Sequence, residues 1–386
     1  MPKMVLFLYL GLSCHKTKGK QLKLTVSSEN GIQVESWAKY VENHLDGTIY
    51  LHPAYLQVLE EQSRQKLLRL VCRDENDIIR GIFPLQYTKG MPYNIWGALV
   101  SKRLSSLPRT PIVGPLAEDN TVVTELINAA MDIISKDPGR ILQIKTYNPD
   151  LPRSSLVKFL WKDEYTTEIP VYPQEIKFIN SKNHSSIKRA VNKAINNGVE
   201  YRLAESEKDL KQWYRLYLDL NKHHTNPPRP YKLFKISWDI LRPKGMMQLA
   251  LAEQKTNGKK KIIAGLVLYY FNKTVTFAYN GSSRKYFNLR PNDLLHWNTI
   301  HNAQKEGYKF YNWGNAGEND AGLAAYKKKW GSEKFSTYQY FYPNPTDIKY
   351  KEGTDPSEFT GLKKFIWQLL PLRLTTIIGA LVYKYL

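Results

Sequence analysis

A repeated strand–turn–strand pattern constrains the fold of this chain more than any other feature. Residues 68–85 read as two apolar segments joined by a charged turn, and residues 247–269 repeat this arrangement far downstream. The second segment of each pair carries Ile-Ile-x-Gly, ending at Gly81 and Gly265. Each pair is followed by another apolar segment, a loop, a helix and a strand. One domain type present twice is the economical explanation, and a chance similarity of two hairpins is the alternative.

The length and composition agree with two ordinary globular domains. A chain of 386 residues exceeds one typical domain, and its 42% apolar and 24% charged residues exclude wholesale disorder and collagen-like order. The two cysteines, Cys14 and Cys72, exclude a disulfide framework and a multi-cysteine zinc site.

Periodicity in the second half predicts alternating helices and strands. Residues 187–195 carry an amphipathic helical stripe that Ser185 or Ser186 could cap, and a second helix starts after Ser206 with Asp209 completing a capping box. The order of elements predicts an α/β fold with α+β mixed sheets. We expect four segments: an N-terminal extension (1–21), a first domain (22–170), a second domain with the active site (171–345) and an amphipathic C-terminal tail (346–386).

The two ends of the chain leave alternatives open. Residues 5–12 are apolar and imitate a short signal peptide, but Gly11 stands where a lipoprotein signal would place leucine before Cys14. We therefore expect the extension to be uncleaved, either as a mis-assigned start or as an extra strand. The tail mixes basic and apolar residues, and we expect it to pack on its own domain rather than lie on a membrane surface.

The charge points to an acidic partner. Fifty-six Lys and Arg against 35 Asp and Glu give a net charge of +21, which suits nucleic acid, an anionic membrane or phosphorylated substrates. The familiar hydrolase, metalloprotease, Walker and Rossmann motifs are missing. His223 and His224 are adjacent, and His296 and His301 are five apart, so neither pair has metal-ligand spacing and we expect no metal site.

The most informative stretch is 279–331. A strand ends at Tyr279 and Asn280, and a basic loop follows with Arg284 and Arg290. Asn292 or Asp293 would then cap a helix whose N-terminal amides could bind a phosphate group. The stretch ends in Tyr-Lys-Lys-Lys-Trp-Gly at residues 326–331. Neighbouring lysines on a helix point about 100° apart, so Lys327 can enter a cleft while Lys328 stays in water.

These motifs resemble a known family. The Asn292-Asp293-Leu294-Leu295 segment, the Gly ending the next strand and the aromatic-Lys-x-x-aromatic-Gly element at 326–331 look like the FemAB-type branch of the GNAT acyltransferase superfamily. The resemblance extends over roughly residues 22–386 and includes His52-Pro53-Ala54-Tyr55. It implies two tandem GNAT-like domains and an N-acyltransferase.

The resemblance also implies residue roles. Lys327 would be the oxyanion or phosphate partner and Tyr326 would help to place it. Asn292 would top the donor-binding helix, and the backbone at Tyr279 and Asn280 would hold the donor carbonyl. Lys188, Arg189 and Arg290 would face phosphates of the donor or acceptor, whereas Arg284 is a candidate because it lies close to the phosphate site at the helix start.

The motifs do not identify the acyl donor or the acceptor. Known family members move aminoacyl groups from tRNA to a peptidoglycan precursor, and relatives are linked to exopolysaccharide loci. This chain lacks both their long charged hairpin and the Gly-x-Gly/Ala cradle of ordinary GNAT enzymes. We expect no tightly bound cofactor, either acyl-CoA or aminoacyl-tRNA as donor, and a phosphorylated or lipid-linked cell-wall or polysaccharide precursor as acceptor.

We expect a cytoplasmic monomer, since the two cysteines suit a reducing compartment, and the positive charge and the tail leave open a peripheral contact with the inner face of an anionic membrane. Two other functions stay open. One is a non-catalytic, basic nucleic-acid-binding protein, which the charge and the 26 tyrosines would suit. The other is a membrane-surface factor for polysaccharide assembly that has kept the fold without activity.

Overall fold

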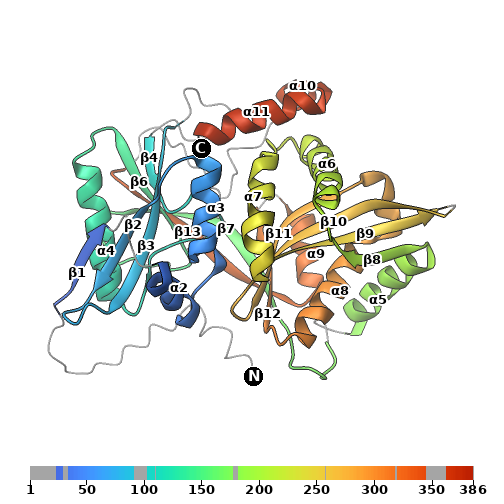
Figure 1. The fold of residues 1–386 in the computed structure, drawn as a ribbon, viewed down its shortest axis with the longest axis horizontal. Helices are drawn as coiled ribbons and strands as arrows, with labels where there is room; N and C mark the ends of the chain where they lie inside the picture. Colours follow the sequence, from blue (N-terminus) through green and yellow to red (C-terminus); the bar gives the residue numbers. More distant parts are fainter. Residues whose placement is uncertain are drawn as a thin grey trace. The chain divides into compact units, whose positions relative to one another are not determined.

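The computed structural model describes residues 23–28, 34–90, 102–108, 110–176, 181–256, 258–317, 320–344 and 362–385. The N-terminal extension, with its signal-like run and Cys14, lies outside the described residues. Helices and strands are mixed along the chain, as the sequence predicts for a mixed α/β fold (Figure 1).

The chain forms two compact units, and it passes between them inside strands. Unit 1 contains the described residues up to Lys162 and the segment that starts at Ser336. Unit 2 contains Asp163–Phe335 and the C-terminal helices up to Lys384. The crossing points fall inside β7 (Val157–Glu168) and β13 (Ser332–Tyr342). The units therefore do not divide at residues 170 and 345, because each of these strands contributes residues to both units.

Unit 1 is a sheet covered by helices. Its strands follow the order β1-β2-β3-β4-β6-β13, with β5 paired to β3. The core lies between the strands and α4 (Asn120–Ser135), whose buried residues include Leu126 and Ile127. The remaining elements are β1 (Thr25–Ser28), α2 (Val34–Asn43), η1 (Ile49–Leu51), α3 (Pro53–Ser63), β2 (Leu68–Arg73), β3 (Ile79–Thr88), β4 (Lys102–Ser105), β5 (Leu116–Ala117) and β6 (Arg140–Thr146).

Unit 2 repeats this plan with helices on both faces of its sheet (Figure 1). Its strands follow the order β8-β9-β10-β11-β12-β7. The elements are α5 (Ser181–Asn196), β8 (Val199–Leu203), α6 (Glu207–His223), α7 (Tyr231–Leu241), η2 (Arg242–Lys244), β9 (Met247–Thr256), β10 (Lys259–Phe271), β11 (Thr274–Ser282), η3 (Arg284–Leu289), α8 (Pro291–Lys305), β12 (Phe310–Ala316) and α9 (Ala321–Lys329).

The two units have the same strand directions. In unit 1 the successive pairs β1-β2, β2-β3 and β3-β4 are antiparallel, β4-β6 is parallel and β6-β13 is antiparallel. In unit 2 the pairs β8-β9, β9-β10 and β10-β11 are antiparallel, β11-β12 is parallel and β12-β7 is antiparallel. Gly81 and Gly265 both lie in the third strand of their sheet, so the repeated hairpins occupy equivalent positions.

The repeated glycines nevertheless face different helices. A Cβ on Gly81 would lie 2.5 Å from Val122 on α4, the helix that connects the parallel strands of unit 1. A Cβ on Gly265 would lie 2.7 Å from Trp213 on α6, which precedes the hairpin of unit 2. Both glycines allow a helix to approach the sheet closely, but on opposite faces. The two glycine-bearing strands therefore occupy equivalent positions in their sheets, but Gly81 and Gly265 themselves are not structurally equivalent residues.

The helix starts of unit 2 test the capping predictions. Ser206 caps α6, and its side chain and that of Asp209 form the expected capping box. α5 begins earlier than expected, at Ser181, so Ser185 and Ser186 lie inside the helix and the prediction that either caps it is wrong.

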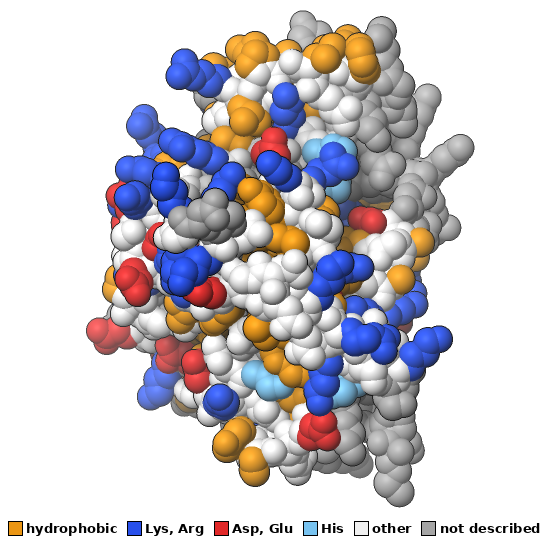
Figure 2. All heavy atoms as spheres, turned by 90° about the vertical axis from the view of Figure 1, so that its right-hand side faces the viewer, with side chains coloured by type: hydrophobic (Ala, Val, Ile, Leu, Met, Phe, Trp, Pro, Cys, Tyr) orange, Lys and Arg blue, Asp and Glu red, His pale blue; other side chains and the backbone are white. Residues whose placement is uncertain are grey.

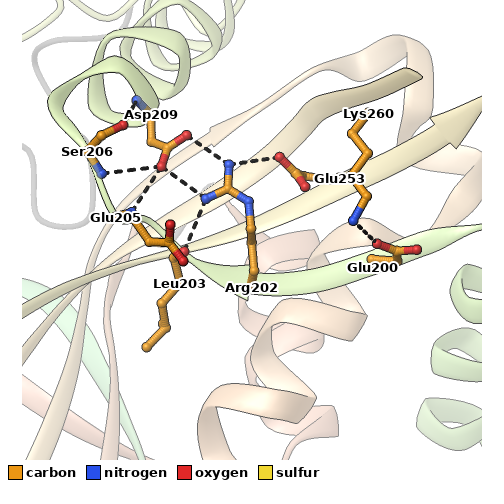
Figure 3. A network of polar contacts seen from close by, with 8 residues as sticks. All are labelled: Glu200, Arg202, Leu203, Glu205, Ser206, Asp209, Glu253 and Lys260. Carbon is orange, nitrogen blue, oxygen red and sulfur yellow. Dashed lines mark hydrogen bonds and ion pairs between the residues drawn. The ribbon is translucent and has the colours of Figure 1, made fainter. Parts of the chain in front are cut away.

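An ion-pair network joins the edge of this sheet to α6 (Figure 3). The guanidinium of Arg202 on β8 donates two hydrogen bonds to the carboxylate of Asp209, at 3.0 and 2.8 Å, and one to Glu253 on β9 at 2.8 Å. These hydrogen bonds lower the pKa of Asp209 to about 2. The network connects three elements of unit 2 and so stabilises this edge.

The C-terminal tail packs on unit 2. It forms α10 (Leu362–Leu369) and α11 (Leu372–Tyr385), in which Trp367 and Val382 are buried. The side chain of Gln368 donates a hydrogen bond to the carbonyl of His223 at the end of α6. No helix among the described residues is long and apolar enough to span a bilayer.

Candidate active site

The central feature of unit 2 is a parting of two parallel strands. β11 and β12 pair only over Thr274–Thr276 and Phe310–Asn312. Beyond these residues, β11 continues over 277–282 and β12 over 313–316, and the two strands no longer pair with each other. β10 and β7 pair with the outer edges of β11 and β12. The inner edges consequently present backbone N–H and C=O groups that the ladder does not use, and such groups bind extended polar ligands.

The helix α8 begins next to this parting. Arg290 occupies the N-cap position with φ 60°, Pro291 is the first helical residue, and no side chain caps the helix. The prediction that Asn292 or Asp293 caps it is therefore wrong, because Pro291 is already the first helical residue and both predicted caps lie inside the helix. The first amides of α8 are left for another acceptor, which favours an anion.

A buried serine joins β11 to α8. The hydroxyl of Ser282, the last residue of β11, lies 2.7 Å from Oδ1 of Asn280 and 2.8 Å from Oδ1 of Asn292. A hydroxyl has one proton, so it donates to one of these oxygens at a time. The contact fixes the end of the strand against the first turn of the helix. Sequence reasoning singled out Asn280 and Asn292 but missed Ser282, although the serine lies on the same strand face as Asn280.

A β-bulge decides which side chains of β11 face α8. Phe277 pairs with Leu268 and Tyr279 pairs with Val267, so Ala278 is an extra residue that reverses the alternation. The ring of Phe277 packs 5.0 Å from the ring of His296 on α8. Beyond the bulge, Asn280 and Ser282 take that face instead.

Tyr279 therefore turns to the opposite face. Its ring packs against Phe234 on α7, with 5.0 Å between centroids, and under the guanidinium of Arg229 at 5.1 Å. Burial raises the pKa of Tyr279 to about 12. Its side chain thus belongs to the packing below α6 and α7, and only its backbone borders the parting.

Lys327 points into the fold and Lys328 points out. The side chain of Lys327 is buried, with only 2% of the residue exposed, whereas Lys328 is exposed, as their 100° separation on a helix predicts. The ammonium of Lys327 donates hydrogen bonds to the carbonyls of Gly314 at 2.8 Å and Asn315 at 2.7 Å. It also lies 5.4 Å from the ring centroid of Tyr165. A buried cation therefore stands at the end of β12.

Tyr326 and His296 form the wall beside this cation. Their ring centroids are 6.1 Å apart, and His296 also packs 4.5 Å from Trp313. Burial, together with the charge of Lys327, lowers the pKa of His296 to about 3, so this histidine is neutral. Burial and the carboxylate of Asp293 raise the pKa of Tyr326 well above its usual range. The wall is apolar and uncharged at neutral pH.

The predicted basic residues separate into two groups. Arg290 lies at the start of α8, and Arg284 lies in η3 with its guanidinium 3.1 Å from Nδ1 of His223. Lys188 and Arg189 are exposed on α5, and Lys188 lies 3.9 Å from the carboxylate of Glu175. The structure brings Arg290 to the parting but does not bring Lys188 and Arg189 there.

Lys188 lies near the other end of α8. Its charge contributes to a lowered pKa of His301, which is mainly due to burial of that ring. His301 is nine residues beyond Asn292, or about 14 Å along a helix.

Two site residues come from a strand that sequence reasoning assigned to the first domain. Tyr165 on β7 packs against the ammonium of Lys327, and Glu164, only 2% exposed, bonds the side-chain amide of Asn312 on β12. Nothing in the local sequence of β7 signals this, because its neighbours are set by the sheet. Within the described parts of the chain, no group of three or more His, Cys, Asp and Glu residues could hold a metal ion.

Comparisons with known proteins found a matching domain family and several similar structures. Residues 181–328 match the acetyltransferase (GNAT) domain family. FemX has a similar structure, with a TM-score of 0.64 and 13% identity over 84% of this chain and 98% of FemX. L-PGS from Bacillus licheniformis gives a TM-score of 0.52 and 13% identity over 83% of this chain and 94% of its own. A comparison with curated protein sequences found no significant match.

At 13% identity, structural similarity is evidence for a shared fold only. The family match at 181–328 lies within unit 2 and includes the parted strands β11 and β12. Residues 181–328 therefore match a GNAT acetyltransferase domain, and the chain has a mixed α/β fold similar to that of FemX.

Proposed function

We propose that unit 2 transfers an acyl or aminoacyl group to an amine of a cell-wall or polysaccharide precursor. The observation that carries this proposal is the parting of β11 from β12, with the start of α8 beside the end of β11 and the ammonium of Lys327 beside the end of β12. An acyl donor needs such a place, where backbone groups hold an extended chain and an uncapped helix start holds a phosphate. The acceptor class rests on the resemblance to FemAB-type sequences.

The reaction joins the amine nitrogen of the acceptor to the acyl carbonyl carbon of the donor. The bond from that carbon to the thiol sulfur of an acyl-CoA, or to the ribose oxygen of an aminoacyl-tRNA, breaks. The amine loses a proton and the leaving group gains one, so that the step balances. The protein must align the reactants and stabilise the negative oxygen of the tetrahedral intermediate.

We assign these tasks to groups at the parted strands. The unpaired N–H groups of β11 over 277–282 would bind the donor chain and face the developing oxyanion. Lys327 would act through its charge and by fixing the carbonyls of Gly314 and Asn315, which sets the width of the parting. Tyr326 would exclude water from beside the reacting carbonyl. Excluding water strengthens electrostatic stabilisation of the intermediate.

The donor phosphate would lie at the start of α8. The amides of Asn292 and Asp293 have no side-chain cap, and Arg290 at the N-cap adds a positive charge. Both donor classes carry phosphate, acyl-CoA in the diphosphate beyond its pantetheine arm and aminoacyl-tRNA in the phosphodiester next to the terminal ribose, so an anion site at α8 suits either. Asn292, fixed by Ser282, would orient these amides rather than cap the helix.

Mass spectrometry of ligands that copurify with the protein, followed by titration with acyl-CoA and with an aminoacyl-tRNA analogue, tests the proposal. We expect one donor class to bind and to lose at least about tenfold in affinity when Arg290 is replaced by Gln. Losing one charge-assisted hydrogen bond to a phosphate group lowers binding affinity by about this factor. The exposed Lys328→Gln serves as the control. Binding of neither donor, or equal loss in both variants, would contradict a donor site at α8.

A further inference from the structure

The outer face of the C-terminal tail is apolar to an unusual degree. Of the eighteen large apolar side chains that are exposed among the described residues, seven lie on α10 and α11 or at their junction. They are Phe365, Ile366, Leu369, Leu372, Leu374, Ile377 and Leu381. Figure 2 shows hydrophobic side chains along the upper edge of unit 2, where Figure 1 places α10. Single exposed apolar residues are ordinary, but a contiguous group indicates a surface that binds something.

Helical geometry separates this face from the packed face. At about 100° a residue, Leu374, Ile377 and Leu381 fall within about 60° of one another on α11. Thr375, Gly379 and Val382 are buried and fall on the other side of the helix. α11 therefore has two distinct faces: one is packed against unit 2, and the other carries apolar side chains that are exposed to solvent.

The tail is held in this orientation by close contacts. A Cβ on Gly379 would lie 2.4 Å from the carbonyl oxygen of Pro228, so α11 approaches the loop after α6 as closely as only glycine allows. The guanidinium of Arg229 lies 5.3 Å from the ring centroid of Tyr383. Rolling the outer stripe inward would break these contacts. The exposed apolar face is thus a stable feature of the folded protein.

The charge of the tail identifies its partner. Residues 359–386 contain Lys363, Lys364, Arg373 and Lys384 and no Asp or Glu. Arg373 is exposed beside the apolar stripe. Exposed apolar residues flanked by basic ones bind the interface of an anionic bilayer, where the apolar groups enter the acyl boundary and the cations meet lipid phosphates.

We propose that α10 and α11 dock this protein on the surface of an anionic lipid bilayer through Phe365, Leu369, Ile377 and Leu381. A second copy of the chain fits this face less well, because a symmetric dimer would bring the basic residues of both tails together. The net charge of +21 adds to that repulsion. The proposal does not depend on the acyl-transfer reaction.

Vesicle flotation tests the docking with the full chain. We expect the protein to float with vesicles that contain phosphatidylglycerol and not with phosphatidylcholine alone. Ile377→Gln with Leu381→Gln should lower the partition coefficient at least about tenfold, since two buried aliphatic side chains are lost. Arg373→Gln should lower it about fivefold, the contribution of one basic residue near an anionic surface.

The matched control replaces exposed apolar residues elsewhere on unit 2. Ile195 on α5 is 54% exposed, as is Leu381, and Leu203 on β8 is also exposed. Ile195→Gln with Leu203→Gln should float like the wild type, and circular dichroism should show all variants folded. Three results would overturn the proposal: no flotation with anionic vesicles, equal loss in the control, or a wild-type dimer in sedimentation that Ile377→Gln with Leu381→Gln dissociates.

Discussion

Replacing Lys327 by methionine probes the cation at the parted strands directly. The substitution keeps most of the buried aliphatic stem and removes the ammonium that bonds the carbonyls of Gly314 and Asn315. Lys328 on the same helix is exposed, so Lys328→Met removes an equal formal charge from solvent and serves as the matched control.

The expected losses of stability and activity differ in size. Hydrogen bonds to a charged group contribute about 1.5–3 kcal/mol each, and part of this loss is recovered when water reaches the half-buried carbonyls. We expect the free energy of unfolding to fall by about 2–4 kcal/mol, which a domain with about 5–15 kcal/mol survives. Acyl transfer should fall further, by about 10²–10³-fold, as when one oxyanion-stabilising group is lost.

Three measurements separate these effects. Thermal unfolding should show a folded but less stable Lys327→Met. Steady-state kinetics with the donor that binds should show the activity loss in this variant and not in Lys328→Met. NMR titration should show a higher pKa for His296, because the charge that helps to lower it is gone. Full activity in a folded Lys327→Met, or equal loss in both variants, would refute the role of Lys327.

Three further predictions concern the frame of the site. Arg202 is the main reason why the pKa of Asp209 is lowered to about 2. The contribution of the Asp209 carboxylate to the free energy of unfolding is therefore present above pH ~4 and is lost as the pH falls toward 2. Acid unfolding should show a loss of about 2 kcal/mol in the free energy of unfolding, and a clearly smaller loss in Arg202→Met, where only the backbone N–H groups of Glu205 and Ser206 still bond the carboxylate. Gly281→Ala places a Cβ 2.8 Å from Nε1 of Trp213 and should lower unfolding free energy by about 1–3 kcal/mol in urea. Ser282→Ala should lower kcat/KM about fivefold in steady-state assays without changing the fold.

The sequence predicts those parts of the fold that depend on local pattern. The repeated hairpins and the capping box of Ser206 follow from alternation and from side chains three residues apart, and the structure confirms both. The orientation of Lys327 and Lys328 follows from helical geometry in the same way. Each of these inferences needs only neighbours in the chain.

Features that depend on tertiary pairing could not be predicted. Tyr165 and Glu164 reach the site because β7 crosses into unit 2 and pairs with β12, although more than a hundred residues separate these strands. The bulge at Ala278, which turns Tyr279 away from α8, appears only in the register of β10 and β11. The sequence shows that the helix around Lys188 is basic, and this favoured a functional role. It does not show how far Lys188 lies from the start of α8, which only the structure reveals.

The contrast between the two units indicates why one of them would bind the donor. In unit 1 the equivalent parallel strands do not part: Ser106, just beyond β4, donates its N–H to Gln143 on β6, and its hydroxyl accepts from the N–H of Lys145.

The ammonium of Lys145 also ties down the segment after β4, with hydrogen bonds to the carbonyls of Leu107 at 2.8 Å and Thr110 at 2.7 Å. The chain itself thus uses the backbone groups that unit 2 leaves open. If the parted strands hold the donor, the described strands of unit 1 offer no equivalent place, and isothermal titration should give one donor bound per chain. A stoichiometry of two would show that the strand edge is not what binds it.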